Sequence, residues 1–298
     1  MTGRWAPSPT GEFHLGNLRT ALLAWLFARS TNRDLLWRFE DLDGAVRKDF
    51  YDGQLRDFER IGLNWDGQIF RQSERLNLYR DAIEDLKRQG LTYRCWCTRR
   101  EIREASVAPH SHFPDGAYSG KCRQLSSKEI SLNERSGRRP ALRLLAEGQL
   151  IEIEDRQLGS FEGVVDDFVL CRGDLTPSYN LAVVVDDADM GVTEVVRGDD
   201  LLPSTPRQVY LFHLLGAQPP CYAHVPLVLS RLGKRLAKRD GAVTLDDRVH
   251  LGESELDVLN YLLSSLRLPN VESFDELDKL AGDFQPGALP TSPWIFDL

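Results

Sequence analysis

The sequence predicts an α/β fold, and two observations support that prediction. Apolar segments of strand length alternate with segments of helical periodicity through the first sixty residues. Acidic residues directly follow the apolar segment 35–39, where a parallel sheet carries its ligand-binding groups. We therefore expect a βαβ unit at the start of the chain, with functional residues at the carboxyl ends of its strands.

The first elements follow in a regular order. Trp5 and Ala6 end a short apolar segment that we expect to be a strand, and a turn rich in proline and glycine covers residues 7–11. Apolar side chains then recur at helical spacing, at Leu18, Ala21, Leu22, Trp25 and Leu26. Residues 35–39 form the second expected strand, which ends in Glu40, Asp41 and Asp43. The order is strand, tight loop, helix and strand.

The pattern changes near Tyr79. A helix with Ala82, Ile83 and Leu86 on one face leads into Cys95-Trp-Cys97, and the loop-rich stretch 104–122 follows. Residues 151–154 alternate at strand period, and we expect them to pair with 161–165 across a turn that contains Gly159. Residues 167–171 suggest one more strand. This region is expected to be an insertion.

The apolar segment 181–185 precedes Asp186 and Asp187. It has the composition of a strand buried on both faces, so we expect it to return the chain to the parallel sheet. After Asp240 the patterns are mainly helical, notably at Leu256, Leu259, Leu263 and Leu266.

Composition limits the class of protein. The 298 residues are 42% apolar and 28% charged, as in ordinary globular chains. The longest apolar run, 21–28, has eight residues, whereas a membrane helix needs about 20. Pro7 and Pro9 lie where an export signal would have its apolar core. We expect a cytoplasmic protein with no membrane contact.

The formal charge of −8 argues against a protein that coats nucleic acid through its overall field. Two local basic clusters could still contact RNA or remain solvated faces: Arg94, Arg99, Arg100 and Arg103, and then Arg231, Lys234, Arg235, Lys238 and Arg239. Five cysteines without an export signal indicate metal ligands or incidental thiols rather than disulfides.

The loop before the first helix can bind phosphate. A helix that begins near Gly16 offers free N–H groups and a positive dipole end, Gly16 allows close approach, and His14 can donate to phosphoryl oxygens. Residues 4–11 (Arg-Trp-Ala-Pro-Ser-Pro-Thr-Gly) with 14–17 (His-Leu-Gly-Asn) resemble the first signature of class I aminoacyl-tRNA synthetases, in their glutamyl and glutaminyl branch. Asn17 replaces the His at the fourth position of that signature.

The second signature of that class is a Lys-Met-Ser-Lys-Ser loop, which residues 233–241 resemble. Lys238 matches the lysine that neutralises the departing pyrophosphate, while Arg235 replaces the first Lys and Ala237 the Ser. Residues 36–43, 179–187 and 195–208 also resemble glutamyl-type segments. The resemblance covers most of residues 1–245.

The resemblance implies a Rossmann-type catalytic domain and specific site residues. It implies catalytic roles for His14 and Lys238, and ATP binding, with Mg²⁺, by His14, Gly16, Asn17 and Lys238. It implies glutamate binding by Arg4, Trp5, Ala6, Pro7, Ser8, Glu40, Tyr179 and Arg197. The guanidinium groups of Arg4 and Arg197 suit the side-chain carboxylate, and Glu40 suits the ammonium. Alternatively, Arg197 forms a structural ion pair with Asp199 or Asp200.

Cys95, Cys97 and Cys122 supply three thiolates, which suffice for a tetrahedral zinc with one further ligand. The residues alone leave His110, His112 and Tyr118 open as the fourth. The spacing Cys-x-Cys with Tyr-x-x-x-Cys resembles the zinc site of short glutamyl-synthetase paralogues, which implies Tyr118 and one structural zinc. Unligated buried cysteines are the alternative.

The resemblance also suggests how the chain is divided. We expect a first catalytic half at 1–78, an insertion at 79–175 that grips an RNA stem and holds zinc, a second catalytic half at 176–240, and a helical segment at 241–298. Only 60 residues follow Lys238 (298 − 238), so no anticodon-binding domain is expected.

That architecture resembles the short paralogues that activate glutamate without tRNA and transfer it to queuosine in the anticodon loop of tRNA(Asp). The expected partners are L-glutamate, ATP and queuosine-containing tRNA(Asp), and the expected state is a monomer. A compact glutamyl-tRNA synthetase that charges a tRNA 3′ end and a catalytically silent tRNA-binding paralogue are the alternatives.

Overall fold

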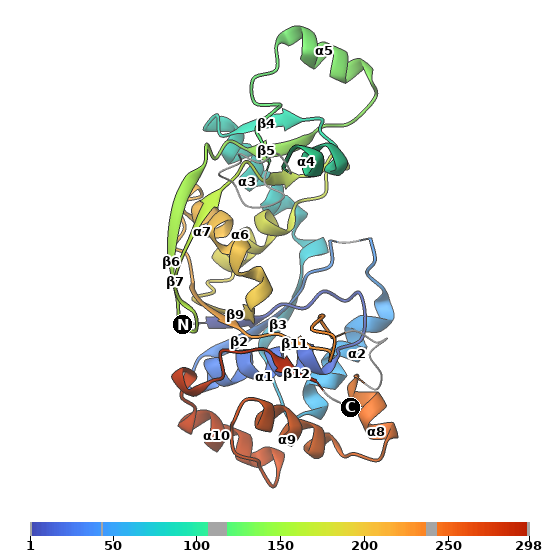
Figure 1. Ribbon diagram of the computed structural model, residues 1–298, viewed down its shortest axis with the longest axis vertical. Coiled ribbons are helices and arrows are strands. Elements are labelled where there is room, and N and C mark those ends of the chain that lie inside the picture. Colours follow the sequence, from blue (N-terminus) through green and yellow to red (C-terminus); the bar gives the residue numbers. More distant parts are fainter. Residues whose placement is uncertain (1, 43, 107–117, 237–242, 297–298) are drawn as a thin grey trace.

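The computed structural model describes residues 2–42, 44–106, 118–236 and 243–296. Its main feature is a seven-stranded sheet in the order β3-β2-β1-β9-β10-β6-β7 (Figure 1). All neighbouring strands pair in parallel except β7, which is antiparallel to β6 at the edge. The strands are β1 (Thr2–Trp5), β2 (Asp34–Phe39), β3 (Asp66–Arg71), β6 (Gln149–Asp155), β7 (Gly159–Val165), β9 (Glu194–Gly198) and β10 (Cys221–Val225).

The strand order reverses beside β1. The chain moves outward from β1 to β2 and β3 on one side, and later from β9 to β10 on the other. In a sheet of this kind the crevice for ligands opens at the carboxyl ends of the two strands where the order reverses. Here these are β1 and β9, so the first strand and its following loop form the floor of the site.

Ten α-helices lie in the part of the chain that the structure describes. They are α1 (Leu15–Arg29), α2 (Lys48–Arg60), α3 (Leu76–Arg88), α4 (Arg99–Ser106), α5 (Ser127–Arg135), α6 (Tyr179–Asp189), α7 (Thr205–Leu214), α8 (Leu245–His250), α9 (Glu255–Ser265) and α10 (Leu277–Asp283). None of these helices is long and apolar enough to cross a bilayer.

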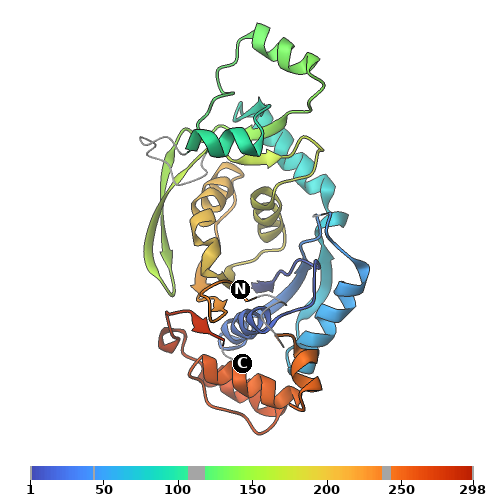
Figure 2. The ribbon, with the colours of Figure 1, turned by 45° about the vertical axis from the view of Figure 1, so that its right-hand side comes forward.

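Helix α1 is the centre of the largest core. Its buried side chains include Trp25 and Phe27, because the sheet covers one side and α9 and α10 cover the other (Figure 2). The rings of Phe27 and Phe284 meet edge to face at 5.4 Å. The C-terminal helices predicted from leucine spacing are confirmed, and they fix the helix whose first turn faces the crevice.

A smaller antiparallel sheet forms the other end of the molecule. It contains β4 (Thr92–Cys95), β5 (Ala141–Leu144) and β8 (Val169–Cys171) in the order β4-β5-β8. Helices α4 and α5 accompany it at the end farthest from α9 and α10 (Figure 1). A two-stranded parallel pair, β11 (Val228–Leu229) with β12 (Trp294–Ile295), links the site to the C-terminal segment.

The expected hairpin of residues 151–154 and 161–165 is confirmed, and Gly159 adopts a φ of 75° at its turn. The position of this hairpin in the large sheet was not predicted from the sequence. Although it lies within the segment 79–175, Tyr222 of β10 pairs with Asp155 of β6, so the hairpin extends the large sheet. The segment expected to be an insertion thereby supplies two strands to the catalytic sheet.

The prediction of a strand at residues 181–185 is wrong. These residues lie in helix α6, which begins where the Ser178 hydroxyl accepts the Leu181 N–H at 3.3 Å. Residues 181–187 are all buried because α3, α7 and β8 pack around the helix. A helix covered on every side shows no amphipathic period, so its sequence looks like a buried strand. Strand β9 returns the chain to the sheet instead.

Candidate active site

A cavity of about 530 Å³ opens at the carboxyl ends of β1 and β9. Eleven of the residues expected to bind glutamate or ATP line it: Arg4, Trp5, Ala6, Pro7, Ser8, His14, Gly16, Asn17, Glu40, Tyr179 and Arg197. They come from β1 and its loop, the first turn of α1, the end of β2, the start of α6, and β9. Lys238 lies outside the described residues.

The loop after β1 is held by hydrogen bonds from two sides. The backbone N–H of Glu40 donates to the Pro7 carbonyl at 2.9 Å. The buried amide of Gln54, on α2, donates to the carbonyls of Ser8 at 3.1 Å and Gly11 at 2.7 Å. These hydrogen bonds fix three carbonyl groups of the loop in the structure described.

His14 caps helix α1. Its Nδ1 accepts the backbone N–H of Asn17 at 3.2 Å, and the Asn17 side chain accepts the His14 N–H at the same distance. Because Nδ1 is an acceptor, the ring proton is on Nε2. Burial, with a contribution from Arg235, lowers the pKa of His14 to about 4. His14 is thus a neutral donor beside a helix N-terminus, which suits phosphoryl oxygens.

Gly16 is required by the packing of that ring. A Cβ at this position would lie 2.9 Å from both Cε1 and Nδ1 of His14, and 3.2 Å from Cβ of Val228. The glycine predicted to allow close approach of phosphate therefore also makes room for the histidine.

Buried charges lie behind the floor of the cavity. Arg38 is fully buried and contacts Asp187 at 2.6 Å, Glu40 at 3.3 Å and Asp186 at 3.6 Å. Burial raises the pKa of Glu40, outweighing the opposite effects of Arg38 and Arg4. An ammonium group in the cavity would favour the charged carboxylate of Glu40, which is the role expected of this residue.

Two buried arginines face the cavity with different partners. Nε of Arg4 lies 3.5 Å from Asp187. Arg197 instead donates to three neutral groups: Nε2 of His224 at 3.0 Å, Oε1 of Gln208 at 2.8 Å and Oγ1 of Thr205 at 2.8 Å. The alternative of an ion pair from Arg197 to Asp199 or Asp200 does not occur among the described residues; Asp200 pairs with Arg235 at 2.9 Å.

The described part of the second signature is a tight turn beside the cavity. The Ser230 N–H donates to the Lys234 carbonyl at 2.7 Å, and Gly233 adopts a φ of 69°. Leu229 bridges to Arg235, which lines the cavity. Arg235 replaces the first lysine of the signature, and its position places a cation opposite the first turn of α1.

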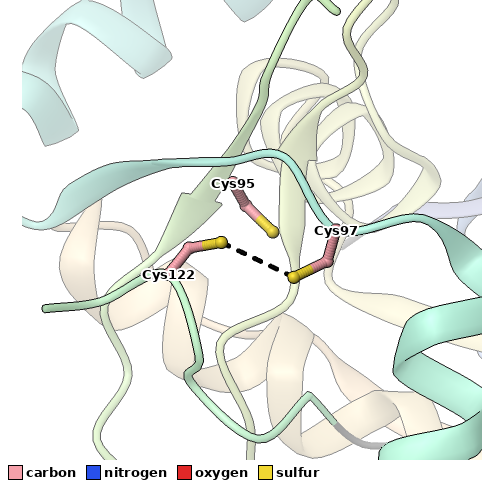
Figure 3. Close-up of side chains that lie close together, drawn as sticks. All are labelled: Cys95, Cys97 and Cys122. Atoms are coloured by element: carbon pink, nitrogen blue, oxygen red, sulfur yellow. Dashed lines mark hydrogen bonds between the residues drawn. The ribbon is translucent and has the colours of Figure 1, made fainter. Parts of the chain in front are cut away.

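A cluster of three thiols lies in the insertion. Cys95 ends β4, Cys97 follows it in the loop, and Cys122 comes from the segment before α5, with the three sulfurs turned toward one another (Figure 3). The sulfur atoms lie within 4.8 Å of one another, with Cys97 and Cys122 at 3.5 Å. The Tyr118 hydroxyl lies 3.4 Å from Sγ of Cys95 and 3.6 Å from Sγ of Cys97.

These distances fit one tetrahedral zinc. Zinc with sulfur ligands at 2.3 Å and an oxygen ligand near 2.1 Å gives S···S separations of about 3.8 Å and S···O separations of about 3.6 Å. The guanidinium of Arg143 lies over the Tyr118 ring, 3.7 Å from its centre. Burial raises the pKa of Tyr118, so loss of its proton would depend on the metal itself. Of the three residues considered for the fourth ligand, Tyr118 is described; His110 and His112 lie outside the described residues.

Sequence reasoning missed three supporting residues, Gln54, Asp155 and His224. Gln54 lies in the amphipathic helix α2, where glutamine is an ordinary residue, so nothing in the sequence indicates that its side chain is buried. His224 stands in the segment Tyr-Ala-His-Val of β10, whose four residues are all buried, and this is an unusual place for an imidazole. The histidine within this apolar segment was the one sign in the sequence that His224 has a special role. The role of Asp155 becomes visible only when β6 is known to pair with β10.

Comparison with known proteins agrees with this geometry. Residues 1–277 match the family model for the catalytic domain of class I tRNA synthetases for glutamate and glutamine (E and Q). A glutamyl-Q tRNA(Asp) synthetase of Nocardia farcinica is 56% identical over 98% of this chain and 92% of its own length. One of Cutibacterium acnes is 50% identical over 92% of this chain and 78% of its own.

Solved structures show the same fold. A glutamate tRNA ligase from Elizabethkingia meningosepticum, in complex with its amino acid, superposes with a TM-score of 0.81 at 26% identity. The match covers 99% of this chain and 66% of that one. The chain belongs to the class I aminoacyl-tRNA synthetases, in the family of the glutamate and glutamine enzymes.

Proposed function

We propose that this chain activates glutamate with ATP, without tRNA, and transfers the glutamyl group to queuosine in the anticodon loop of tRNA(Asp). The observation that carries the proposal is one cavity in which the Arg197 guanidinium and the capped N-terminus of α1 face the same space. The first suits a side-chain carboxylate and the second suits phosphate. The names of the relatives from Nocardia farcinica and Cutibacterium acnes support the choice of acceptor.

The proposed activation step assigns a role to each group. Arg4 and Arg197 bind the side-chain carboxylate, Glu40 binds the ammonium, and Ser8 and Tyr179 orient the substrate. The α-carboxylate oxygen attacks the α-phosphorus of ATP, the bond to the pyrophosphate oxygen breaks, and glutamyl adenylate and pyrophosphate form. His14 Nε2–H and the N–H groups of α1 stabilise the charge that develops on the phosphoryl oxygens. Lys238 and the Mg²⁺ that accompanies ATP neutralise the leaving group.

Transfer then requires only an alcohol nucleophile near the adenylate. A hydroxyl of the queuosine cyclopentenediol attacks the glutamyl carbonyl, AMP leaves, and an ester remains on the tRNA. Tyr179, which lies at the cavity mouth with 40% of its surface exposed, borders both this cavity and a second one beside Arg99 and Arg207. The acceptor nucleoside would enter along this border.

Charge supports RNA binding by the end of the insertion. Residues 91–143 contain eleven Lys and Arg and five Asp and Glu, a net charge of +6, although the whole chain carries −8. This segment includes β4, α4 and α5, at the end of the molecule farthest from the C-terminal helices (Figure 2). A positive end on an otherwise acidic protein directs a polyanion to that end.

One structural zinc is part of the proposal. Cys95, Cys97, Cys122 and Tyr118 would hold it with no open position, so it would fix structure rather than take part in the chemistry. It would join the end of β4 to the segment before α5 within the part of the insertion that carries the positive charge.

Pyrophosphate exchange tests the activation step. Labelled pyrophosphate should enter ATP when glutamate is added, without tRNA, and Lys238→Ala should abolish the exchange. A purified wild type with no glutamate-dependent exchange would favour the silent paralogue over an enzyme.

Acceptor charging tests the second step. Labelled glutamate should transfer to tRNA from cells that make queuosine and not to tRNA from cells that lack it. Equal transfer to both would favour a compact glutamyl-tRNA synthetase.

A further inference from the structure

A buried hydrogen-bonded chain leads from strand β6 to the Arg197 guanidinium. Asp155 Oδ2 lies 2.6 Å from Nδ1 of His224, and Nε2 of His224 lies 3.0 Å from Nε of Arg197. The His224 side chain is fully buried, and Asp155 and Arg197 are 5% exposed. The three residues come from β6, β10 and β9, three adjacent strands of the large sheet.

The donors and acceptors in this chain have one consistent arrangement. Arg197 Nε carries a hydrogen and can only donate, so Nε2 of His224 must accept. The imidazole proton is then on Nδ1 and points to the Asp155 carboxylate. Burial lowers the pKa of His224, which agrees with a neutral ring. Asp155 thus selects the tautomer of His224 that can hold Arg197.

These hydrogen bonds orient the Arg197 guanidinium but do not neutralise its positive charge. Its partners among the described residues, His224, Gln208 and Thr205, are uncharged, and they use three of its five N–H groups. Arg38, by contrast, is surrounded by three carboxylates. Within the described part of the chain, one N–H remains on each terminal nitrogen of Arg197, and no carboxylate contacts the guanidinium to compensate its positive charge.

We propose that His224, aligned by Asp155, is a positioning residue that fixes Arg197 for the side-chain carboxylate of glutamate and so sets the preference for glutamate over glutamine. The inference rests on the proposed function, because it takes glutamate as the ligand of Arg197. A carboxylate in place of His224 would neutralise the Arg197 guanidinium. A neutral acceptor instead orients the guanidinium and leaves its positive charge available to the substrate carboxylate.

The backbone makes Asp155 a rigid anchor. Its Oδ1 accepts the N–H groups of Gln157 at 2.9 Å and Leu158 at 3.0 Å, and Oδ2 accepts that of His224 at 3.1 Å. Burial alone would raise the pKa of Asp155, but the hydrogen bond from the His224 ring, together with the backbone N–H groups of Gln157 and His224, lowers it. The pairing of β6 with β10 therefore joins the β6–β7 hairpin to the proposed amino-acid site.

Glutamate-dependent pyrophosphate exchange with three variants tests the proposal. His224→Asn retains a donor for Asp155 and removes the acceptor for Arg197, so KM for glutamate should rise about tenfold or more, with KM for ATP changed less than about twofold. His224→Gln can place a carbonyl near the position of Nε2, so it should restore much of the loss. Asp155→Asn offers Nδ1 an amide donor that favours the other tautomer, and it should raise KM for glutamate while leaving KM for ATP unchanged.

Selectivity is the second readout. In His224→Asn the ratio of kcat/KM for glutamate to that for glutamine should fall about tenfold, because a guanidinium that can rotate no longer favours a carboxylate over an amide. His213→Asn, at an exposed histidine of α7, is the matched control and should behave as wild type.

Each outcome decides a different question. Wild-type KM and selectivity in His224→Asn would overturn the inference and leave the proposed function intact, as would an equal rise in KM for ATP and glutamate in both His224 variants. Absence of glutamate-dependent exchange in the wild type would overturn the proposed function itself. If His224→Asn does not melt cooperatively, Asp155→Asn decides: a rise in KM for glutamate alone supports the inference, and wild-type KM and selectivity overturn it.

Discussion

His14 and Asn17 cap each other across the first turn of α1: Nδ1 of the histidine accepts the Asn17 N–H, and the asparagine side chain accepts the His14 N–H, each at 3.2 Å. This arrangement leaves Nε2–H of His14 free of the cap. Asn17, which differs from the histidine of the family signature, thereby takes part in orienting the neighbouring residue.

The first prediction concerns the stability of the cap against pH. The pKa of His14 is lowered to about 4 by burial and Arg235, so between pH 4 and 6.5 the unfolded chain binds a proton that the folded chain does not. The contribution of His14 to the free energy of unfolding is therefore fully present above pH 6.5 and is lost as the pH falls toward 4. The variant His14→Asn keeps a side chain that can cap the helix but does not titrate in this pH range, so it is the reference protein.

Thermal melts should show wild type losing stability relative to His14→Asn between pH 6.5 and 4.5, by about 2 kcal/mol after allowance for solvent screening. Parallel stability curves of the two proteins over this range would show that the pKa of the half-buried His14 is not lowered.

The second prediction concerns Gly16. Gly16→Ala should displace the His14 ring, since the added Cβ would lie 2.9 Å from it. We expect kcat/KM for ATP to fall about 10- to 100-fold, as happens when a catalytic group moves by about 1 Å. Gly53→Ala on α2 is the control, because its Cβ would meet only Nη2 of Arg56 at 4.0 Å, and activity should be unchanged. Full activity in Gly16→Ala would show that the ring position is not critical.

The third prediction concerns Gln54. Gln54→Leu leaves the carbonyls of Ser8 and Gly11 without their donor. The free energy of unfolding should fall by about 2 to 3 kcal/mol. KM should rise for both substrates, because the loop lines the cavity proposed to bind both. Urea unfolding and exchange kinetics measure the two effects. Gln89→Leu, at an exposed residue after α3, is the control and should change neither the free energy of unfolding nor KM. If Gln54→Leu has the same stability and KM as Gln89→Leu, the Gln54 amide does not support the loop.

The fourth prediction concerns zinc. Elemental analysis of the purified protein should give about one zinc per chain, strongly reduced by Cys95→Ala and also reduced by Tyr118→Phe. Cys221→Ala removes an exposed thiol outside the cluster and should leave the metal content unchanged. Full zinc in Tyr118→Phe would exclude the phenol as a ligand, and a metal-free wild type would favour unligated cysteines.

The sequence predicted the first catalytic half well, because strand, turn and helix there have distinct local patterns. It failed at residues 181–185, where packing on all sides of α6 removed the helical period. It could not place the β6–β7 hairpin in the large sheet, since Asp155 and Tyr222 pair across 67 residues of chain. His224 was missed for the same reason: its partners are distant in sequence, and only the sheet brings them together.

Transfer of glutamate to an anticodon nucleoside can be distinguished from 3′-end charging by mapping the labelled position on the tRNA. Purified queuosine-containing tRNA(Asp), charged with labelled glutamate, is cut with ribonuclease and its fragments are separated at mildly acidic pH, at which the ester survives. We expect label in the anticodon-loop fragment and none at the 3′ end. Label at the 3′-terminal adenosine would contradict it.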